Sequence, residues 1–178
     1  MYLYFYLVAF SLVGYGFLSS RFLNIDNNNF GILGLLGIIN IAVISYGTSL
    51  FIKHGLIFNS AVLLIGVILF FLNLKRLKNL KKELIYFILI FSVLLLFITI
   101  GKNHDDFPYY HFPYIQLLND YPHPFGLGQL NNGFRSPSSV FFISSIFFLP
   151  KIGIYLFHIL PALILGFANI FLIKNIFD

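Results

Sequence analysis

A polar segment at residues 101–138 gathers many of the side chains that could do chemistry. It reads GKNHDDFPYYHFPYIQLLNDYPHPFGLGQLNNGFRSPS and holds three of the six acidic residues, three of the five histidines and five of the seven prolines. The whole chain is 59% hydrophobic and only 10% charged. Because so apolar a chain concentrates its ionisable groups here, we expect the functional site in this segment.

The acidic pair Asp105 and Asp106, with His104 before it, is the strongest candidate for catalysis. Adjacent carboxylates repel each other, so a nearby cation or strong donor is needed to keep both ionised. They could take a proton from an acceptor hydroxyl, or hold a divalent cation such as Mg²⁺ or Mn²⁺ that neutralises a phosphate. The alternative is a solvated pair that caps a helix beginning near Pro108.

An aromatic cluster follows the acidic pair and comprises Tyr109, Tyr110, His111, Phe112 and Tyr114. Rings at the level of the lipid headgroups commonly anchor a protein at the membrane surface. The same rings could stack on a sugar, so Tyr109, Tyr110 and His111, together with His104, are candidates for substrate contact. Anchoring is the simpler explanation of the cluster as a whole.

The stretch at residues 126–135 is rich in glycine and asparagine and ends in Arg135. Glycine lets the main chain approach a ligand, and a guanidinium suits bidentate contact with phosphate. No Gly-Lys-Ser/Thr follows, so the stretch is not a P-loop. We expect Asn132 and Arg135 to contact a phosphorylated substrate, although a turn-rich connector at headgroup level explains the same composition.

The composition of the whole chain indicates an integral membrane protein. Soluble domains carry about 45–50% apolar and about 25% charged residues, whereas this chain has 59% and 10% and a mean hydropathy of +0.91. The net charge of +5 does not indicate nucleic-acid binding, because five of the eleven basic residues lie within residues 75–82, beside an apolar run. Cysteine is absent, which excludes disulfides and thiolate chemistry.

Five apolar runs approach or exceed the length of about 20 residues that a membrane-spanning helix needs. They cover residues 2–18, 30–52, 55–74, 84–100 and 152–173. The run at 140–149 is too short to cross alone, so we expect an interfacial or re-entrant helix capped by Ser138 or Ser139. Pro161 should kink the last span, and the spacing of Gly31, Gly34 and Gly37 is compatible with close helix packing or with a merely glycine-tolerant helix.

The sequence therefore predicts an all-α polytopic membrane bundle in three parts. Residues 1–100 form four spans with a basic loop at 75–82, residues 101–138 form a long external loop with short interfacial helices, and residues 139–178 form the short helix and the final span. The positive-inside rule places the basic loop in the cytoplasm. Segment 101–138 then lies on the periplasmic side, as in a bacterial inner-membrane protein.

A membrane helix that delivers an Asp pair to an external loop rich in proline and aromatic residues resembles the GT-C superfamily of glycosyltransferases over about residues 84–173. The resemblance implies transfer of a sugar from a polyprenyl-phosphate-linked donor, with Asp105 and Asp106 as general base or metal ligands and Arg135 at the donor phosphate. The acidic loop of that family usually follows the first span, whereas three apolar runs precede the matching one here. Family members are also far longer than 178 residues, which suggests an N-terminal fragment.

Two other classes of function compete with a transferase. A transporter or flippase predicts ionisable groups inside spans near the bilayer midplane, and this sequence offers only His158 near Pro161. A non-catalytic membrane subunit predicts no particular arrangement of the acidic pair. The concentration of acids outside the apolar runs favours the transferase.

Overall fold

The structure is a computed structural model that describes residues 2–25, 29–77, 80–100, 105–136, 138–150, 152 and 159–177. All regular elements within these ranges are helical, which confirms the predicted fold class. Five helices are long and apolar enough to cross a membrane, and they indicate an integral membrane protein. They are α1 (Tyr2–Phe22), α2 (Phe30–Ser49), α3 (Leu56–Asn73), α4 (Leu80–Ile100) and α7 (Ile159–Phe177).

Shorter helices fill the connections. A 3₁₀ turn, η1 (Leu74–Arg76), extends α3, and α6 (Ser139–Phe147) precedes the last long helix. The described part of segment 101–138 contains a π turn and three further elements: η2 (Phe107–His111), α5 (Phe112–Asp120), η3 (Leu127–Gln129) and η4 (Asn132–Phe134). The described part of the polar segment is therefore folded into short helices.

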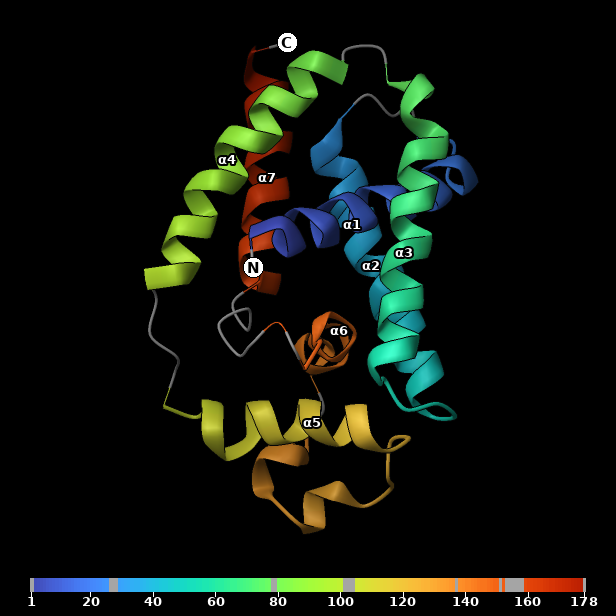
Figure 1. The fold of residues 1–178 in the computed structure, drawn as a ribbon, viewed down its shortest axis with the longest axis vertical. Helices are drawn as coiled ribbons and strands as arrows, with labels where there is room; N and C mark the ends of the chain where they lie inside the picture. Colours follow the sequence, from blue (N-terminus) through green and yellow to red (C-terminus); the bar gives the residue numbers. More distant parts are fainter. Residues whose placement is uncertain are drawn as a thin grey trace.

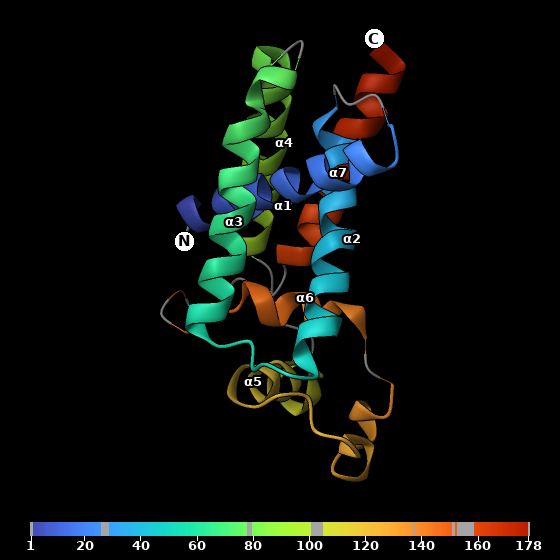
Figure 2. The same cartoon turned by 90° about the vertical axis from the view of Figure 1, so that its right-hand side faces the viewer.

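The long helices do not all run the same way. In Figure 1, α2, α3, α4 and α7 run along the length of the molecule, α5 lies across one end, and α6 lies between α5 and the long helices. Figures 1 and 2 both show α1 lying across the other long helices. The protein buries 67% of the apolar window of α1 but only 28% of that of α3 or α4. Thus α1 forms the centre of the bundle, while α3 and α4 keep apolar surface for lipid.

Glycines on α2 let its backbone approach two neighbouring helices. A Cβ added to Gly37 would lie 1.8 Å from the carbonyl oxygen of Leu12 in α1, and one added to Gly31 would lie 2.5 Å from that of Phe167 in α7. The ring of Phe167 also covers Gly34. The structure therefore confirms close packing as the role of these three glycines.

Phenylalanine rings fill the space between α1, α4 and α7. The ring centroid of Phe87 lies 4.8 Å from that of Phe10 and 4.4 Å from that of Phe91, and Phe91 lies 5.0 Å from Phe167. Phe87, Phe91 and Phe167 are fully buried. Contacts of this kind hold helices together in lipid, where burial of apolar surface gives little driving force.

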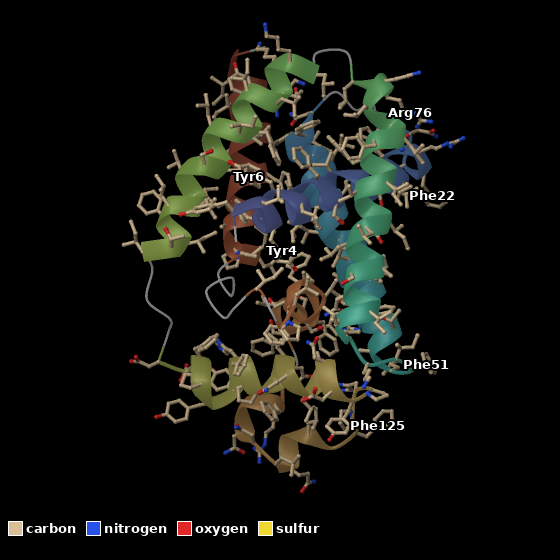
Figure 3. The ribbon with its side chains drawn as sticks, viewed as in Figure 1. Tyr4, Tyr6, Phe22, Phe51, Arg76 and Phe125 are labelled. Atoms are coloured by element: carbon tan, nitrogen blue, oxygen red, sulfur yellow. The ribbon has the colours of Figure 1, made fainter. Side chains whose placement is uncertain are left out.

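The two ends of the bundle carry different side chains. Figures 1 and 3 show the end of η1, the start of α4 and the end of α7 together at one end, and α5 with Phe125 at the other. The basic end carries Lys75, Arg76, Lys81, Lys82 and Lys174. The basic loop and the described part of segment 101–138 thus lie at opposite ends, as the parity of the spans predicted. The external placement of that segment stays a prediction from the positive-inside rule.

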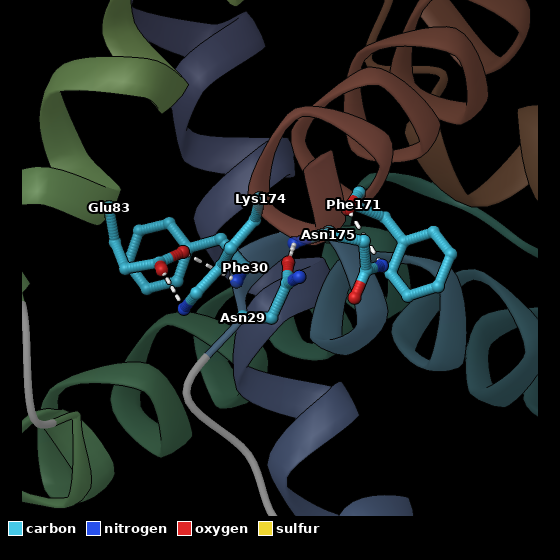
Figure 4. Close-up of polar contacts among 7 residues, drawn as sticks. Asn29, Phe30, Glu83, Phe171, Lys174 and Asn175 are labelled. Carbon is cyan, nitrogen blue, oxygen red and sulfur yellow. Dashed lines mark hydrogen bonds and ion pairs between the residues drawn. The ribbon is translucent and has the colours of Figure 1, made fainter. Parts of the chain in front are cut away.

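A buried carboxylate joins three helices at the basic end. Glu83, in the first turn of α4, is 2% exposed and forms an ion pair with Lys174 of α7. Its other carboxylate oxygen accepts a hydrogen bond of 2.8 Å from the backbone N–H of Phe30, the first residue of α2. Figure 4 shows the contacts of the Glu83 carboxylate with both partners as dashed lines. The sequence analysis did not single out Glu83, because it stands among lysines and its partners are far along the chain.

One expectation for the last part of the chain is confirmed, and two stay predictions. The Ser138 cap of α6 is confirmed, since its hydroxyl accepts from the Val140 N–H at 3.3 Å. Residues 141–147 are all buried within the protein, and an interfacial or re-entrant position of α6 in the membrane stays a prediction. Pro161 lies near the start of the described part of α7, and the kink expected there stays a prediction as well. His158 lies outside the described residues.

Candidate functional site

The acidic pair stands directly before the turn that starts the folded part of the loop. The carbonyl of Asp106 accepts hydrogen bonds of 3.2 Å from the N–H groups of Tyr109 and Tyr110, so the chain turns at this residue. The side chain of Asp106 makes no capping bond. Its Oδ2 instead accepts a hydrogen bond of 2.8 Å from the Tyr110 hydroxyl. The side chain of Asp106 therefore does not cap the turn that begins at Phe107.

The carboxylate of Asp106 makes the phenol of Tyr110 less acidic. The hydrogen bond to Asp106, with some burial and the charge of the same carboxylate, raises the pKa of Tyr110. Tyr110 is then a neutral donor that orients one oxygen of Asp106. Asp105 is exposed, so its carboxylate faces solvent beside this pair.

The turn at residues 131–135 docks onto η2 through an amide and a glycine. The side-chain N–H of Asn131 donates to the carbonyl of Tyr109 at 3.1 Å, and its side-chain oxygen accepts from the Gly133 N–H at 2.8 Å. A Cβ added to Gly133 would lie 2.7 Å from the ring of Tyr110, so the ring packs against bare backbone there. The fold thus brings the acidic pair next to the turn that carries Asn132 and Arg135.

A pocket of about 550 Å³ opens between α5 and this turn. We call it the loop pocket, and its lining comprises Tyr114, His123, Pro124, Phe125, Gly126, Leu127, Gly128, Gln129, Asn132, Phe134 and Arg135. Gly126 has φ of +81°, a backbone conformation that glycine adopts without strain and that turns the chain around the pocket. Asn132 and Arg135, which the sequence predicted as phosphate contacts, both line it and are both exposed.

Two polar atoms of the pocket lining are buried without a partner in the described part of the chain. They are the hydroxyl of Tyr114, a fully buried residue, and Nδ1 of half-buried His123. Burial raises the pKa of Tyr114 to about 12 and lowers the pKa of His123, so both groups are neutral at pH 7. A buried polar group without a partner costs about 1–3 kcal/mol, so native proteins rarely leave one unsatisfied without a reason.

The other predicted site residues that the structure describes do not line the pocket: they are Asp105, Asp106, Tyr109, Tyr110 and His111. Tyr109 is 72% exposed, as suits an interface anchor, and the ring of His111 packs 5.1 Å from that of Phe141. His104 lies outside the described residues. Among the described ranges, no cluster of three or more His, Cys, Asp or Glu residues could hold a metal ion. Sequence patterns found the acids, Asn132 and Arg135, but not the buried hydroxyl of Tyr114.

A buried polar joint fastens the loop to the long helices. The side-chain N–H₂ of Asn59 in α3 lies within hydrogen-bond distance of four oxygens, three of them on residues of α5 or the α6 region. The four are the carbonyls of His54 (2.8 Å), Ser145 (2.8 Å) and Phe148 (2.9 Å) and Oδ1 of Asn119 (3.1 Å). Asn59 is fully buried, so this amide holds the start of α3 against α5 and α6.

His54 lies at the centre of the joint and is fully buried. Its Nε2 is 3.0 Å from the hydroxyl of Thr48 in α2, and its Nδ1 is 2.6 Å from that of Ser145 in α6. Burial lowers its pKa to about 4, so the ring is neutral at pH 7 and carries one N–H. The ring N–H donates to one of these two hydroxyls, and each hydroxyl also lies 2.6 Å from a backbone carbonyl of its own helix, that of Ile44 for Thr48 and that of Phe142 for Ser145. The sequence analysis did not single out this histidine, which falls between two apolar runs.

We expect the free energy of unfolding to fall as the pH drops from about 6.5 to about 4. In this window His54 is protonated in the unfolded chain but neutral in the folded chain, because its pKa is about 4 when folded and 6.5 ordinarily. The loss should reach about 3 kcal/mol at the acid end. Unfolding in detergent at several pH values measures it. If a His54→Gln variant keeps the same pH dependence, this assignment is wrong.

Comparison with known proteins adds a family but no activity. The chain matches a family model described as Domain of unknown function (DUF8201) over residues 1–178. No curated protein and no solved structure matches the chain.

Proposed function

The chain belongs to the DUF8201 family, and we propose that it binds a polyprenyl-phosphate-linked sugar at the loop end of the bundle and helps to transfer that sugar to an acceptor hydroxyl. The loop pocket carries this proposal. It combines a cation at the rim with amide groups and with two buried polar atoms that lack partners within the described residues. A sugar phosphate offers hydroxyls to the buried atoms and an anion to the cation.

The rim of the pocket suits the phosphate of the donor. The guanidinium of Arg135 is exposed and can make two parallel charge-assisted hydrogen bonds to phosphate oxygens. The side chain of Asn132 is exposed beside it and adds an amide donor. Phe125 is 92% exposed at the same rim, where an aromatic ring suits the headgroup region and the start of the prenyl chain.

The acidic pair supplies the base for the transfer step. A bond forms between the acceptor oxygen and the anomeric carbon of the sugar, while the bond from that carbon to the donor phosphate oxygen breaks. The polyprenyl phosphate leaves with the electron pair of the broken bond, and the acceptor proton passes to the carboxylate of Asp105 or Asp106. Tyr110 is a positioning residue, because it orients Asp106 through the 2.8 Å hydrogen bond.

A divalent cation fits the acidic pair only with help from the substrate. Mg²⁺ is commonly held by one or two carboxylates together with substrate phosphates, and Asp105 and Asp106 are the residues that would hold it here. Such an ion would neutralise charge on the donor phosphate. Within the described residues no further carboxylate or imidazole joins the pair to complete a cluster of three.

The long helices favour a transferase over a transporter. Within their described residues, Asp, Glu, Lys, Arg and His occur only in the end turns, at Arg21, Lys81, Lys82, Glu83 and Lys174. A transporter site needs such groups near the bilayer midplane. We accordingly propose chemistry at the membrane surface, on the periplasmic side that the positive-inside rule predicts for the loop.

The test uses the full-length protein in membranes with a panel of radiolabelled polyprenyl-phosphate hexoses. Combined Asp105→Asn and Asp106→Asn substitution should lower transfer by at least about 100-fold, the scale of general-base catalysis. Binding of the donor should survive in that variant. Arg135→Gln should instead weaken donor binding by about tenfold or more, because it removes a charged hydrogen-bond donor.

Asp120→Asn is the matched control, since Asp120 is an exposed carboxylate at the opposite end of α5 from the acidic pair. It should leave transfer unchanged. Unaltered transfer by a folded double aspartate variant would remove the catalytic role. Donor binding without transfer by the native chain would point to a non-catalytic subunit.

A further inference from the structure

A second cleft, of about 910 Å³, opens beside the turn between α2 and α3. We call it the α3 cleft, and its lining comprises Ile52, Lys53, Gly55, Leu56, Ile57, Phe58, Ala61, Gln116, Asn119, Asp120, Phe148 and Pro150. Helix α5 separates it from the loop pocket. Tyr114 faces the loop pocket, whereas Gln116 and Asn119 face the α3 cleft, as expected for residues two and five positions further along a helix.

The floor of the cleft is continuous with surface that faces lipid. Ile57 is 86% exposed and begins an apolar face of α3 that continues toward the basic end. The large exposed residues of that face are Leu64, Ile65, Ile68, Phe71 and Leu72. The cleft lies at the end of α3, where a span of this length reaches the headgroup layer. An acyl chain could therefore lie along α3 with its headgroup in the cleft.

Two opposite charges line the cleft. Lys53 on the α2–α3 turn and Asp120 at the end of α5 are both exposed, and neither has an ion pair or a hydrogen bond to its side chain within the described residues. Nearby, Gln116 presents an exposed amide. A cation and a carboxylate around an apolar floor match a headgroup that carries both a phosphate and an amine.

We propose that the α3 cleft binds one phospholipid with a zwitterionic headgroup that ends in a primary amine. Lys53 contacts the phosphate, Asp120 accepts hydrogen bonds from the ammonium, and an acyl chain covers Leu56, Ile57 and Ala61. A primary ammonium has three N–H donors for a carboxylate, whereas a quaternary amine has none. An anionic headgroup would place its charge near Asp120. This site does not depend on the sugar-transfer proposal.

The test is native mass spectrometry of the full-length protein released from micelles that contain phosphatidylethanolamine, phosphatidylcholine or phosphatidylglycerol in turn. The native chain should retain phosphatidylethanolamine about tenfold better than the other two, the scale of one charged hydrogen-bonding contact. Asp120→Asn should remove that preference, and Lys53→Gln should weaken retention of both zwitterionic lipids. Ala61→Phe places a ring on the exposed floor of the cleft and should lower retention of all three lipids.

Arg76→Gln is the control, because Arg76 is an exposed cation at the opposite end of the bundle. It should change none of these ratios, and thermal unfolding of each variant checks that the fold is kept. Equal retention of the three lipids by the native chain would overturn the proposal. An undiminished preference for phosphatidylethanolamine in Asp120→Asn would overturn it as well. Neither result bears on sugar transfer, which the Asp105 and Asp106 variants test separately.

Discussion

Replacement of Glu83 with alanine should lower the free energy of unfolding by about 3–5 kcal/mol, which is the usual cost of removing one partner of a buried ion pair. The substitution leaves the ammonium of Lys174, whose side chain is only 16% exposed, without its carboxylate. It also removes the acceptor of the Phe30 N–H at the start of α2. Unfolding of the purified protein in mixed micelles measures the loss. Far-ultraviolet circular dichroism is the signal, because the chain has no tryptophan for fluorescence.

A double variant separates the contribution of the ion pair to stability from the cost of removing only one of its charges. Removing both charges, with Glu83→Met and Lys174→Met together, should cost less than Glu83→Ala alone, because the Lys174 ammonium is removed together with the Glu83 carboxylate. Lys81→Gln changes an exposed charge in the same turn of α4 and should shift stability by no more than about 0.5 kcal/mol. If Glu83→Ala behaves like Lys81→Gln, Glu83 does not join the three helices.

Local pattern was enough to locate the long helices and α6, but it gave no bounds for the short helices within segment 101–138. Uninterrupted apolar runs located the five long helices, and the Ser138 cap located α6, because these signals lie within the element that they define. The crossing of α1 was not predictable in this way. Its run length is the same as that of a lengthwise span, and its direction depends on contacts with other helices, among them the close approach of Gly37 to Leu12.

The long-range polar contacts of the fold could not be found from local pattern. Glu83 and Lys174 are 91 positions apart, and so are His54 and Ser145. Nothing in the sequence next to any of these residues points to its partner. Asp106 and Arg135 were predictable, because acids and a lone arginine stand out in an apolar chain. The unpartnered hydroxyl of Tyr114 appears only once the chain is folded.

The α2 helix links the two ends of the molecule. Its first residue, Phe30, donates to Glu83 at the basic end. Its last residue, Ser49, accepts a hydrogen bond of 2.7 Å from the backbone N–H of His123, which lines the loop pocket. A displacement of α2 should therefore disturb both the Glu83 contact and the loop pocket. Gly37 contacts α1 midway along α2, and a single methyl group added there should displace α2.

Gly37→Ala should destabilise the fold by about 3 kcal/mol, the upper end of the range for overpacking, because the new methyl meets backbone and not a flexible side chain. Its carbon would lie 1.8 Å from the Leu12 carbonyl oxygen, so α1 and α2 must separate. Gly47→Ala on the same helix is the matched control, since nothing lies within 4 Å of a Cβ there. That variant should gain about 0.5–1 kcal/mol from helix propensity. Thermal unfolding of the two variants measures both changes in stability, and equal effects at the two positions would refute the close approach of α1 and α2.

The same pair of variants tests the link from α2 to the loop pocket. Because Ser49 of α2 accepts a hydrogen bond from the backbone N–H of His123, Gly37→Ala should weaken donor binding at the loop pocket, whereas Gly47→Ala should leave it unchanged.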